Sequence, residues 1–289
     1  MSLSRSPLPQ SVIVTRLRAA GCVFAEDEAR LLISTARTPA GLAAMVDRRA
    51  AGLPLEHVLG WAEFCGLRIA VDPGVFVPRR RTEFLIRQAA ALARQAASPA
   101  GRQVLARPRA VVVDLCCGSG AMGAALVAAL DQVELYAADI DPAAVRCARR
   151  NITIAGGQVY EGDLYEPLPA TLRGRVDVLV ASAPYVPTEA IGLLPTEARI
   201  HEPRVALDGG ADGLDVVRRV IAAAPLWLAP SGYLLVETSG RQAPQTAETI
   251  ARNGLIPRVA TSDELDATVV IGARAPSRGD RAADPVLRT

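Results

Sequence analysis

The chain has 289 residues, half of them apolar, and a formal net charge of only +2 at pH 7. This composition suits a folded protein with one large and one small domain, and the near-neutral charge argues against a dedicated nucleic-acid binder. Five cysteines without CxxC spacing and only two histidines argue against a disulfide framework and against a metal site. Because we find neither a signal-peptide core nor a run of about 18 apolar residues, we expect a reduced cytoplasmic protein that does not span a membrane.

The N-terminal part of the chain divides into a helical segment and a linking segment. Residues 1–53 are expected to form a small helical domain, because apolar residues recur at roughly helical spacing. Residues 54–80 change character, and two short strands at 61–64 and 67–71 predict a β-hairpin linker. A helix is then expected over residues 82–97.

From residue 81 to residue 275, strands and helices alternate regularly. Strands are expected at 110–114, 133–138, 157–160, 176–181, 233–238, 256–261 and 268–273, and helices at 121–130, 142–151, 213–228 and 241–252. This alternation predicts an α/β fold with a doubly wound, mostly parallel seven-stranded sheet of the Rossmann-like class. Residues 276–289 are polar and contain proline and glycine, so we interpret them as a disordered tail.

The turn after the first of these seven strands carries the strongest functional signal. Asp114 ends that strand, the run Cys116-Cys117-Gly118-Ser119-Gly120 follows, and the next strand ends at Asp139. A strand, a glycine-containing turn, a helix and an acid at the next strand end are typical of a nucleoside-binding site in a doubly wound sheet. Asp139 would accept hydrogen bonds from ribose hydroxyls. An inert tight turn is the alternative, and the acids at both strand ends argue against it.

Two kinds of nucleoside cofactor fit such a turn. The run from Gly118 to Gly123 formally satisfies GxGxxG, which also occurs in dinucleotide-binding folds. A dinucleotide brings a pyrophosphate, however, and Asp114 would repel it. S-adenosylmethionine carries an ammonium and a sulfonium group instead, so an acid before the turn suits it better. Asp163, at the expected end of the third strand, would accept from the adenine amino group or cap a helix.

Three further segments complete a family pattern. They are Ser182-Ala183-Pro184-Tyr185 after the fourth strand, the run from Glu202-Pro203 to Leu214, and the run from Phe76 to Glu83, which contains Pro78-Arg79. With the turn at 114–120, they resemble the protein-(glutamine-N5) methyltransferase family that modifies peptide-chain release factors, over residues 48–274. The resemblance implies a class I S-adenosylmethionine-dependent methyltransferase fold. It also implies methylation of a glutamine side-chain amide in a release factor or a related ribosome-associated protein.

The chain departs from the family pattern at three places. The first glycine of the usual turn is Cys116, whose Cβ is tolerable only if φ stays negative. The helical region, which recognises the protein substrate in the family, looks shorter by one or two helices. The asparagine and first proline of the usual N-P-P-Y turn are Ser182 and Ala183. The resemblance implies that the Ser182 hydroxyl and the Ala183 carbonyl accept from the substrate amide, with Tyr185 packed against it.

The candidate site therefore has three groups of residues. The catalytic candidates are Ser182, Ala183, Pro184 and Tyr185. The cofactor-binding candidates are Asp114, Cys116, Cys117, Gly118, Ser119, Gly120, Asp139, Asp163, Leu164 and Ser182. The substrate-binding candidates are Phe76, Pro78, Arg79, Glu202 and Pro203, and ordinary interdomain packing is the alternative for the first three.

Two other functions stay open at this point. One is N-methylation of RNA or DNA bases, because similar turns occur in amino-group methyltransferases that act on bases. The other is a non-catalytic module that binds S-adenosylmethionine, which the changes at Cys116 and Ser182 would favour. We expect a monomer that acts on a protein without binding nucleic acid directly, and we interpret Arg79-Arg80-Arg81 as a solvated turn rather than a basic patch.

Overall fold

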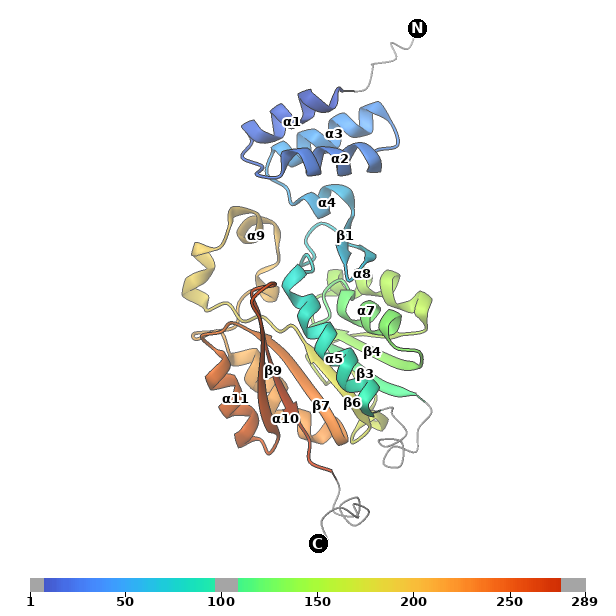
Figure 1. Cartoon of the computed structure of the whole chain (residues 1–289), viewed down its shortest axis with the longest axis vertical. Coiled ribbons are helices and arrows are strands. Elements are labelled where there is room, and N and C mark those ends of the chain that lie inside the picture. The colour runs from blue at the N-terminus through green and yellow to red at the C-terminus, as the bar shows by residue number, and fades with distance from the viewer. Residues whose placement is uncertain (1–7, 97–108, 277–289) are drawn as a thin grey trace.

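The computed structural model describes residues 8–96 and 109–276. Three helices at one end of the molecule stand apart from a large sheet (Figure 1). They are α1 (Gln10–Ala19), α2 (Ala25–Thr35) and α3 (Pro39–Ala50). Their own apolar core includes Ile13, Leu17, Leu32 and Val46, which are all fully buried. The helical periodicity of this segment therefore correctly predicted its structure.

A linking segment connects these helices to the sheet. It contains α4 (Leu55–Leu59), the antiparallel hairpin of β1 (Trp61–Phe64) and β2 (Leu67–Ala70), and a 3₁₀ turn before α5 (Glu83–Ala96). The predicted hairpin is thus confirmed. The side chain of Asn151 ties it to the sheet domain, since its Oδ1 accepts from the Ala70 N–H at 2.9 Å and its Nδ2 donates to the Ala70 carbonyl at 2.9 Å.

The sheet has seven strands in the order β5-β4-β3-β6-β7-β9-β8. Its strands are β3 (Ala110–Leu115), β4 (Val133–Asp139), β5 (Gln158–Glu161), β6 (Val176–Ala181), β7 (Leu228–Thr238), β8 (Ile256–Ser262) and β9 (Ala267–Ala273). The pairs from β5 to β7 are parallel, whereas β9 is antiparallel to both of its neighbours. The predicted doubly wound, mostly parallel sheet is confirmed.

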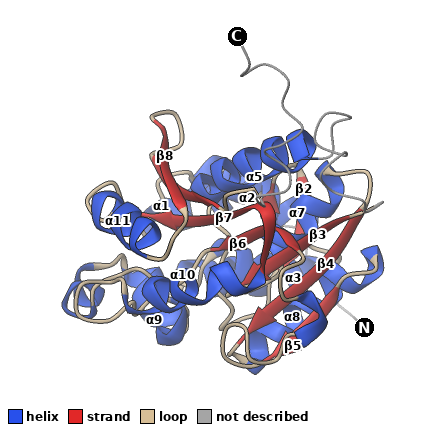
Figure 2. Cartoon of the chain, turned by 90° about the horizontal axis from the view of Figure 1, so that it is seen from below, coloured by secondary structure: helices blue, strands red, loops and turns tan. Residues whose placement is uncertain are grey.

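Helices cover both faces of the sheet (Figure 2). The helices that follow the strands are α7 (Ala121–Ala129), α8 (Pro142–Ile152), α10 (Asp215–Trp227) and α11 (Ala243–Arg252). One apolar core joins the sheet to α5, α7 and α8, and the other joins it to α10 and α11. Alternate residues of β3 point into the two cores: Val111 and Val113 into one, Val112 into the other. This arrangement explains why the strands read as nearly continuous apolar runs.

Two parts of the chain differ from the sequence-based expectation. Strand β7 begins at Leu228 rather than at 233, because the chain continues through an irregularity in its pairing with β6, where Ser231 has φ 61°. A proline and a glycine at that point predict a turn, which hid the first half of the strand. The segment 188–206 forms three short helical pieces, including α9 (Thr196–His201), and each begins directly after a proline. These pieces are too short to show an apolar periodicity.

The strand order indicates where a ligand would bind. β3 lies between β4 and β6, so the chain crosses to opposite sides of β3 at this point of the sheet. In open α/β sheets, ligands bind outside the carboxyl ends of the strands at such a switch point. The linking segment and α9 both lie over this end of the sheet, between it and the N-terminal helices (Figure 1). No helix within the described ranges is long and apolar enough to cross a membrane.

Candidate active site at the carboxyl edge of the sheet

The turn after β3 has a backbone that favours glycine at three positions. Cys116, Gly118 and Gly120 have φ values of 54°, 54° and 78°. The condition that φ of Cys116 stays negative is therefore not met, and this residue adopts a left-handed conformation at a cost of about 1–2 kcal/mol. At Gly120 a Cβ would lie 2.7 Å from the Ile152 side chain, so a glycine is needed for α7 to approach α8.

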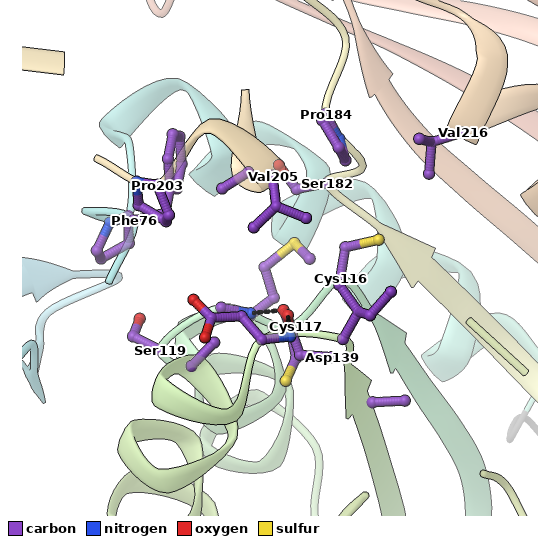
Figure 3. Close-up of a pocket in the computed structure, with 18 of the residues that line it drawn as sticks. Phe76, Cys116, Cys117, Ser119, Asp139, Ser182, Pro184, Pro203, Val205 and Val216 are labelled. Carbon is purple, nitrogen blue, oxygen red and sulfur yellow. Dashed lines mark hydrogen bonds between the residues drawn. The ribbon is translucent and has the colours of Figure 1, made fainter. Parts of the chain in front are cut away.

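Asp139 at the end of β4 is fixed by backbone donors. Its Oδ2 accepts from the Gly118 N–H at 2.8 Å, and its Oδ1 accepts from the Asp141 N–H at 2.9 Å (Figure 3). Burial raises the pKa of the Asp139 carboxyl, and the two N–H groups oppose that shift. Two oxygens with one protein donor each keep lone pairs for further hydrogen bonds. The carboxylate can therefore accept from a bound ligand without giving up its present partners.

Asp114 lies beneath the turn rather than on its open side. It is fully buried, and its Oδ2 accepts from the Gly123 N–H at 2.9 Å in the first turn of α7. Its Oδ1 has no partner among the described residues. Burial, with Asp139 adding to the effect, raises the pKa of Asp114 to about 8 against the pull of the Gly123 N–H. In this structure Asp114 anchors the start of α7 and does not reach the cavity described next.

A first cavity of about 260 Å³ opens above this turn. Its walls include most of the predicted site residues, namely Phe76, Pro78, Arg79, Cys116, Cys117, Gly118, Ser119, Asp139, Asp163, Leu164, Ser182, Pro184 and Pro203. In Figure 3, Asp139, Cys117 and Ser119 lie on one side, and Ser182 and Pro184 lie across the cavity from them. Asp163 also pairs with Arg219 at 2.6 Å, so its carboxylate is already partly satisfied. Asp114 and Gly120 lie outside this lining.

A glycine-rich segment packs against the turn after β6. Ala183 and Pro184 are buried, whereas Ser182 is half-buried and faces the cavity. The glycines at 209 and 213 pack directly against the turn, since a Cβ at Gly209 would lie 2.7 Å from the Pro184 carbonyl and one at Gly213 would lie 2.3 Å from the Tyr185 carbonyl. The glycine-rich run that contributed to the family resemblance therefore supports the Ser182 turn.

The predicted substrate-binding residues meet at one wall. Glu202 is buried, and its carboxylate accepts from Arg79 Nη2 at 2.5 Å and from the Val77 N–H at 3.3 Å. Burial raises the pKa of Glu202, and Arg79 opposes that shift. Phe76 and Pro203 both line the first cavity and are drawn on the same side of it in Figure 3. The linking segment and the segment 188–206 are thus joined beside the cavities by a buried carboxylate.

A second cavity of about 370 Å³ adjoins the first. It shares Phe76, Arg79, Ser182 and Ala206 with the first cavity. Its other walls include Pro54, Glu56, Arg81, Ala183, Tyr185, Glu197, Glu202 and Glu237. Ser182 therefore lies where the two cavities meet, and Ala183, Tyr185 and Glu202 face the second one.

Glu237, and the pairing of two arginines before α5 with buried carboxylates, were not predicted from the sequence. Glu237 is buried near the end of β7, and Tyr185 Oη and Arg81 Nε both donate to its Oε1, at 3.1 and 3.3 Å. The segment 79–81 is accessible to solvent, because Arg80 and Arg81 are exposed and Arg79 is half-buried. Arg79 and Arg81 nevertheless each pair with a buried carboxylate, which the sequence did not predict. The signal that could have found Glu237 is the one that identified Asp114 and Asp139: an acid near the end of an apolar strand.

Comparisons with known proteins identify related methyltransferases. The model of the family "Methyltransferase small domain" matches residues 102–211. A release factor glutamine methyltransferase of Geobacter sulfurreducens is 37% identical over 232 residues, which cover 80% of this chain and 76% of that protein. One of Mycolicibacterium smegmatis is 36% identical over 243 residues, covering 83% of this chain and 82% of the relative.

A solved structure supports the fold independently. The crystal structure of a methyltransferase from Pyrococcus furiosus superposes with a TM-score of 0.51 at 15% sequence identity, and covers 81% of this chain and 98% of the other. At this identity the likeness concerns the fold alone. The identity and coverage of the sequence relatives carry the assignment, and this chain belongs to the release factor glutamine methyltransferase family.

Proposed function

We propose that this protein transfers a methyl group from S-adenosylmethionine to the side-chain amide nitrogen of a glutamine in a peptide-chain release factor. Membership of the family supports the reaction and the substrate. The single structural observation that carries the proposal is the position of Ser182 in the walls of both cavities. A donor in the first cavity and an acceptor entering through the second would meet at this residue.

The first cavity suits the proposed cofactor. Asp139 lines it with free acceptor capacity beside the Gly118 N–H, which suits the two hydroxyls of a ribose. Ile140 and Leu164 add apolar surface for an adenine ring. Burial raises the pKa of the Cys116 thiol far above its usual value, so this side chain stays neutral beside a cationic ligand. When bound, S-adenosylmethionine supplies a methyl group on a positively charged sulfur.

The residues of the Ser182 turn would hold the acceptor amide. An amide nitrogen is a poor nucleophile because its lone pair is delocalised into the carbonyl, so position contributes most of what the protein can add. We infer that Ser182 Oγ and the Ala183 carbonyl each accept a hydrogen bond from one N–H group of the glutamine NH₂. Tyr185 would pack against the amide plane. After transfer, the excess proton on nitrogen passes to water.

Substrate recognition is assigned to the N-terminal part of the chain. We propose residues 1–53 as the recognition domain, 54–80 as the linker and 81–275 as the methyltransferase domain. Arg49 supports this division, because it is buried between the two parts and donates to Glu28 at 2.6 Å and to Glu197 at 2.6 Å. The recognition domain would therefore be coupled to the segment that walls the second cavity. We further propose that the protein acts in the cytoplasm as a monomer, without binding nucleic acid directly.

Labelled cofactor provides the test of this function. Purified protein is incubated with methyl-labelled S-adenosylmethionine and either a recombinant release factor, the same factor with its candidate glutamine changed to alanine, or ribosomal RNA. We expect label only in the unmodified release factor. Label in the RNA would establish base methylation instead. Cofactor binding without label in any acceptor would indicate a non-catalytic module.

A further inference from the structure

The second cavity contains a buried carboxylate at the level of the Ser182 turn. Ala181 and Val236 are partners in the parallel pairing of β6 with β7, so Ser182 and Glu237 occupy the next position on adjacent strands. Adjacent strands lie about 4.8 Å apart. The side chain of Glu237 is only 4% exposed. The carboxylate therefore lies beside the place where the acceptor glutamine would be held.

The two oxygens of this carboxylate have different surroundings. Oε1 accepts from Tyr185 Oη and Arg81 Nε, and the Arg81 guanidinium lies 5.8 Å from the centre of the Tyr185 ring. Burial raises the pKa of the Tyr185 phenol, and the negative charge of Glu237 raises it further. Tyr185 therefore stays protonated and keeps donating. Oε2 is buried and has no partner among the described residues. A buried acceptor left without a donor costs about 1–3 kcal/mol.

The charges around the cavity indicate which donor would fit. Three of the carboxylates in its walls already have an arginine: Glu237 has Arg81, Glu202 has Arg79, and Glu197 has Arg49. A cationic side chain beside Glu237 would be repelled by Arg81. A neutral N–H avoids this repulsion, and every non-proline residue of an extended protein segment carries one.

We propose that the second cavity holds the main chain of the protein segment bearing the methylated glutamine, and that Glu237 Oε2 accepts a hydrogen bond from a main-chain N–H of that segment. This inference rests on the proposed function. It makes Glu237 a substrate-binding residue, whereas Arg81 and Tyr185 act through it as positioning residues. Because a main-chain N–H is common to nearly all residues, this contact fixes the path of the segment and does not select its side chains. The glutamine side chain would then turn from this path toward Ser182.

The test is the substitution Glu237→Gln, which keeps the size of the side chain and places an amide in the buried site. We expect KM for the release factor to rise by about 10-fold, because the amide loses the charged acceptor, with the affinity for S-adenosylmethionine unchanged. The matched control is Glu248→Gln on α11, where an exposed glutamate pairs with Arg252. It should leave every kinetic constant as in the wild type.

A second variant separates substrate binding from a purely structural role. Tyr185→Phe removes one donor to Oε1 and leaves Oε2 intact, so its effect on KM should be smaller than that of Glu237→Gln. Equal effects of the two variants, with no further loss in the double variant, would show that Glu237 acts only through Tyr185 and would overturn the inference.

A third measurement uses the wild-type protein and does not depend on how the variants fold. In a crystal structure of the complex with the release factor, a main-chain nitrogen of the bound segment should lie within about 3.2 Å of Glu237 Oε2. Water or a side chain at that position would contradict the inference. If the wild-type protein does not methylate the release factor at all, the proposed function fails. If it does so and Glu237→Gln retains the wild-type KM, only this inference fails.

Discussion

The cofactor side of the sheet edge is the part at the ends of β3 and β4 where we propose that the cofactor binds, and the acceptor side is the part at the ends of β6 and β7 where we propose that the glutamine binds. The acids of the cofactor side contact residues that are nearer in sequence than the partners on the acceptor side. On the cofactor side, Asp114 binds an N–H nine residues away and Asp139 binds one 21 residues away. On the acceptor side, Arg81 and Glu237 are 156 residues apart. The first kind of contact leaves a pattern in the sequence. The second kind arises only when the fold brings separate segments together.

The largest expected effect separates the chemistry of the two sides. Ser182→Ala should lower kcat by about 10²–10³-fold, the loss found when one donor or acceptor that stabilises a transition state is removed. The affinity for S-adenosylmethionine should stay within about 2-fold, because Asp139 and the turn after β3 are unchanged. Single-turnover kinetics and calorimetry measure the two quantities. The matched control, Thr249→Ala on α11, removes a hydroxyl away from both cavities and should change neither.

The next prediction concerns the affinity for the cofactor instead of the rate. Asp139→Asn should weaken binding of S-adenosylmethionine by about 10–100-fold, because a charged acceptor is lost where the ribose would bind. At saturating cofactor, kcat should remain close to the wild-type value. The control is Asp131→Asn, at an exposed position, and calorimetric titration gives the affinities. A fall in kcat at saturation with unchanged affinity would move Asp139 from cofactor binding to the acceptor side.

The buried acid of the cofactor side predicts a pH dependence of stability. The pKa of Asp114 is raised to about 8 in the folded protein, above the ordinary carboxyl value of the unfolded chain. The folded state therefore holds the Asp114 proton more tightly than the unfolded chain does. The protonated Asp114 carboxyl stabilises the folded state at acid pH, and this contribution is lost as pH rises toward 8. The free energy of unfolding should fall by about 2 kcal/mol or more between pH 5 and pH 8. In the variant Asp114→Asn, this fall of the free energy of unfolding with pH should disappear. An unchanged slope would show that Asp114 is ionised throughout.

The smallest effect concerns the strained turn. Cys116→Gly should be more stable to urea than Cys116→Ala by about 1 kcal/mol, because φ at this position is 54° and neither variant has the sulfur atom. At most positions the order is the reverse. A more stable alanine variant would mean that the turn relaxes to a negative φ in solution.

Much of the fold could be predicted because its determinants are periodic or local. The strands of the sheet and its mostly parallel arrangement follow from apolar runs that end in acids or small-residue turns. Strand β7 was predicted too short, because Pro230 and Gly232 mark a turn in sequence but an irregularity within the strand in the structure. The short helices of 188–206 were missed because no periodic pattern can form over so few residues.

The site was predictable to a similar extent. The strand-end acid Asp139, the turn at 116–120 and the Ser182 turn were identified, and most of these residues line the first cavity. The sequence did not indicate that Asp114 would be fully covered or that Cys116 would adopt a positive φ. Both depend on how α7 packs on the sheet. The second cavity has walls from the linker, the 188–206 segment and two strands, so its composition follows from tertiary structure alone.

Tandem mass spectrometry of the release factor after reaction with wild-type protein and with Ser182→Ala tests the central claim most directly. With saturating S-adenosylmethionine, the wild type should place one methyl group on a glutamine side-chain amide, and Ser182→Ala should form the same product at a much lower rate. A methyl group on another residue type, or equal rates for the two proteins, would contradict the claim that the amide is methylated at the Ser182 turn.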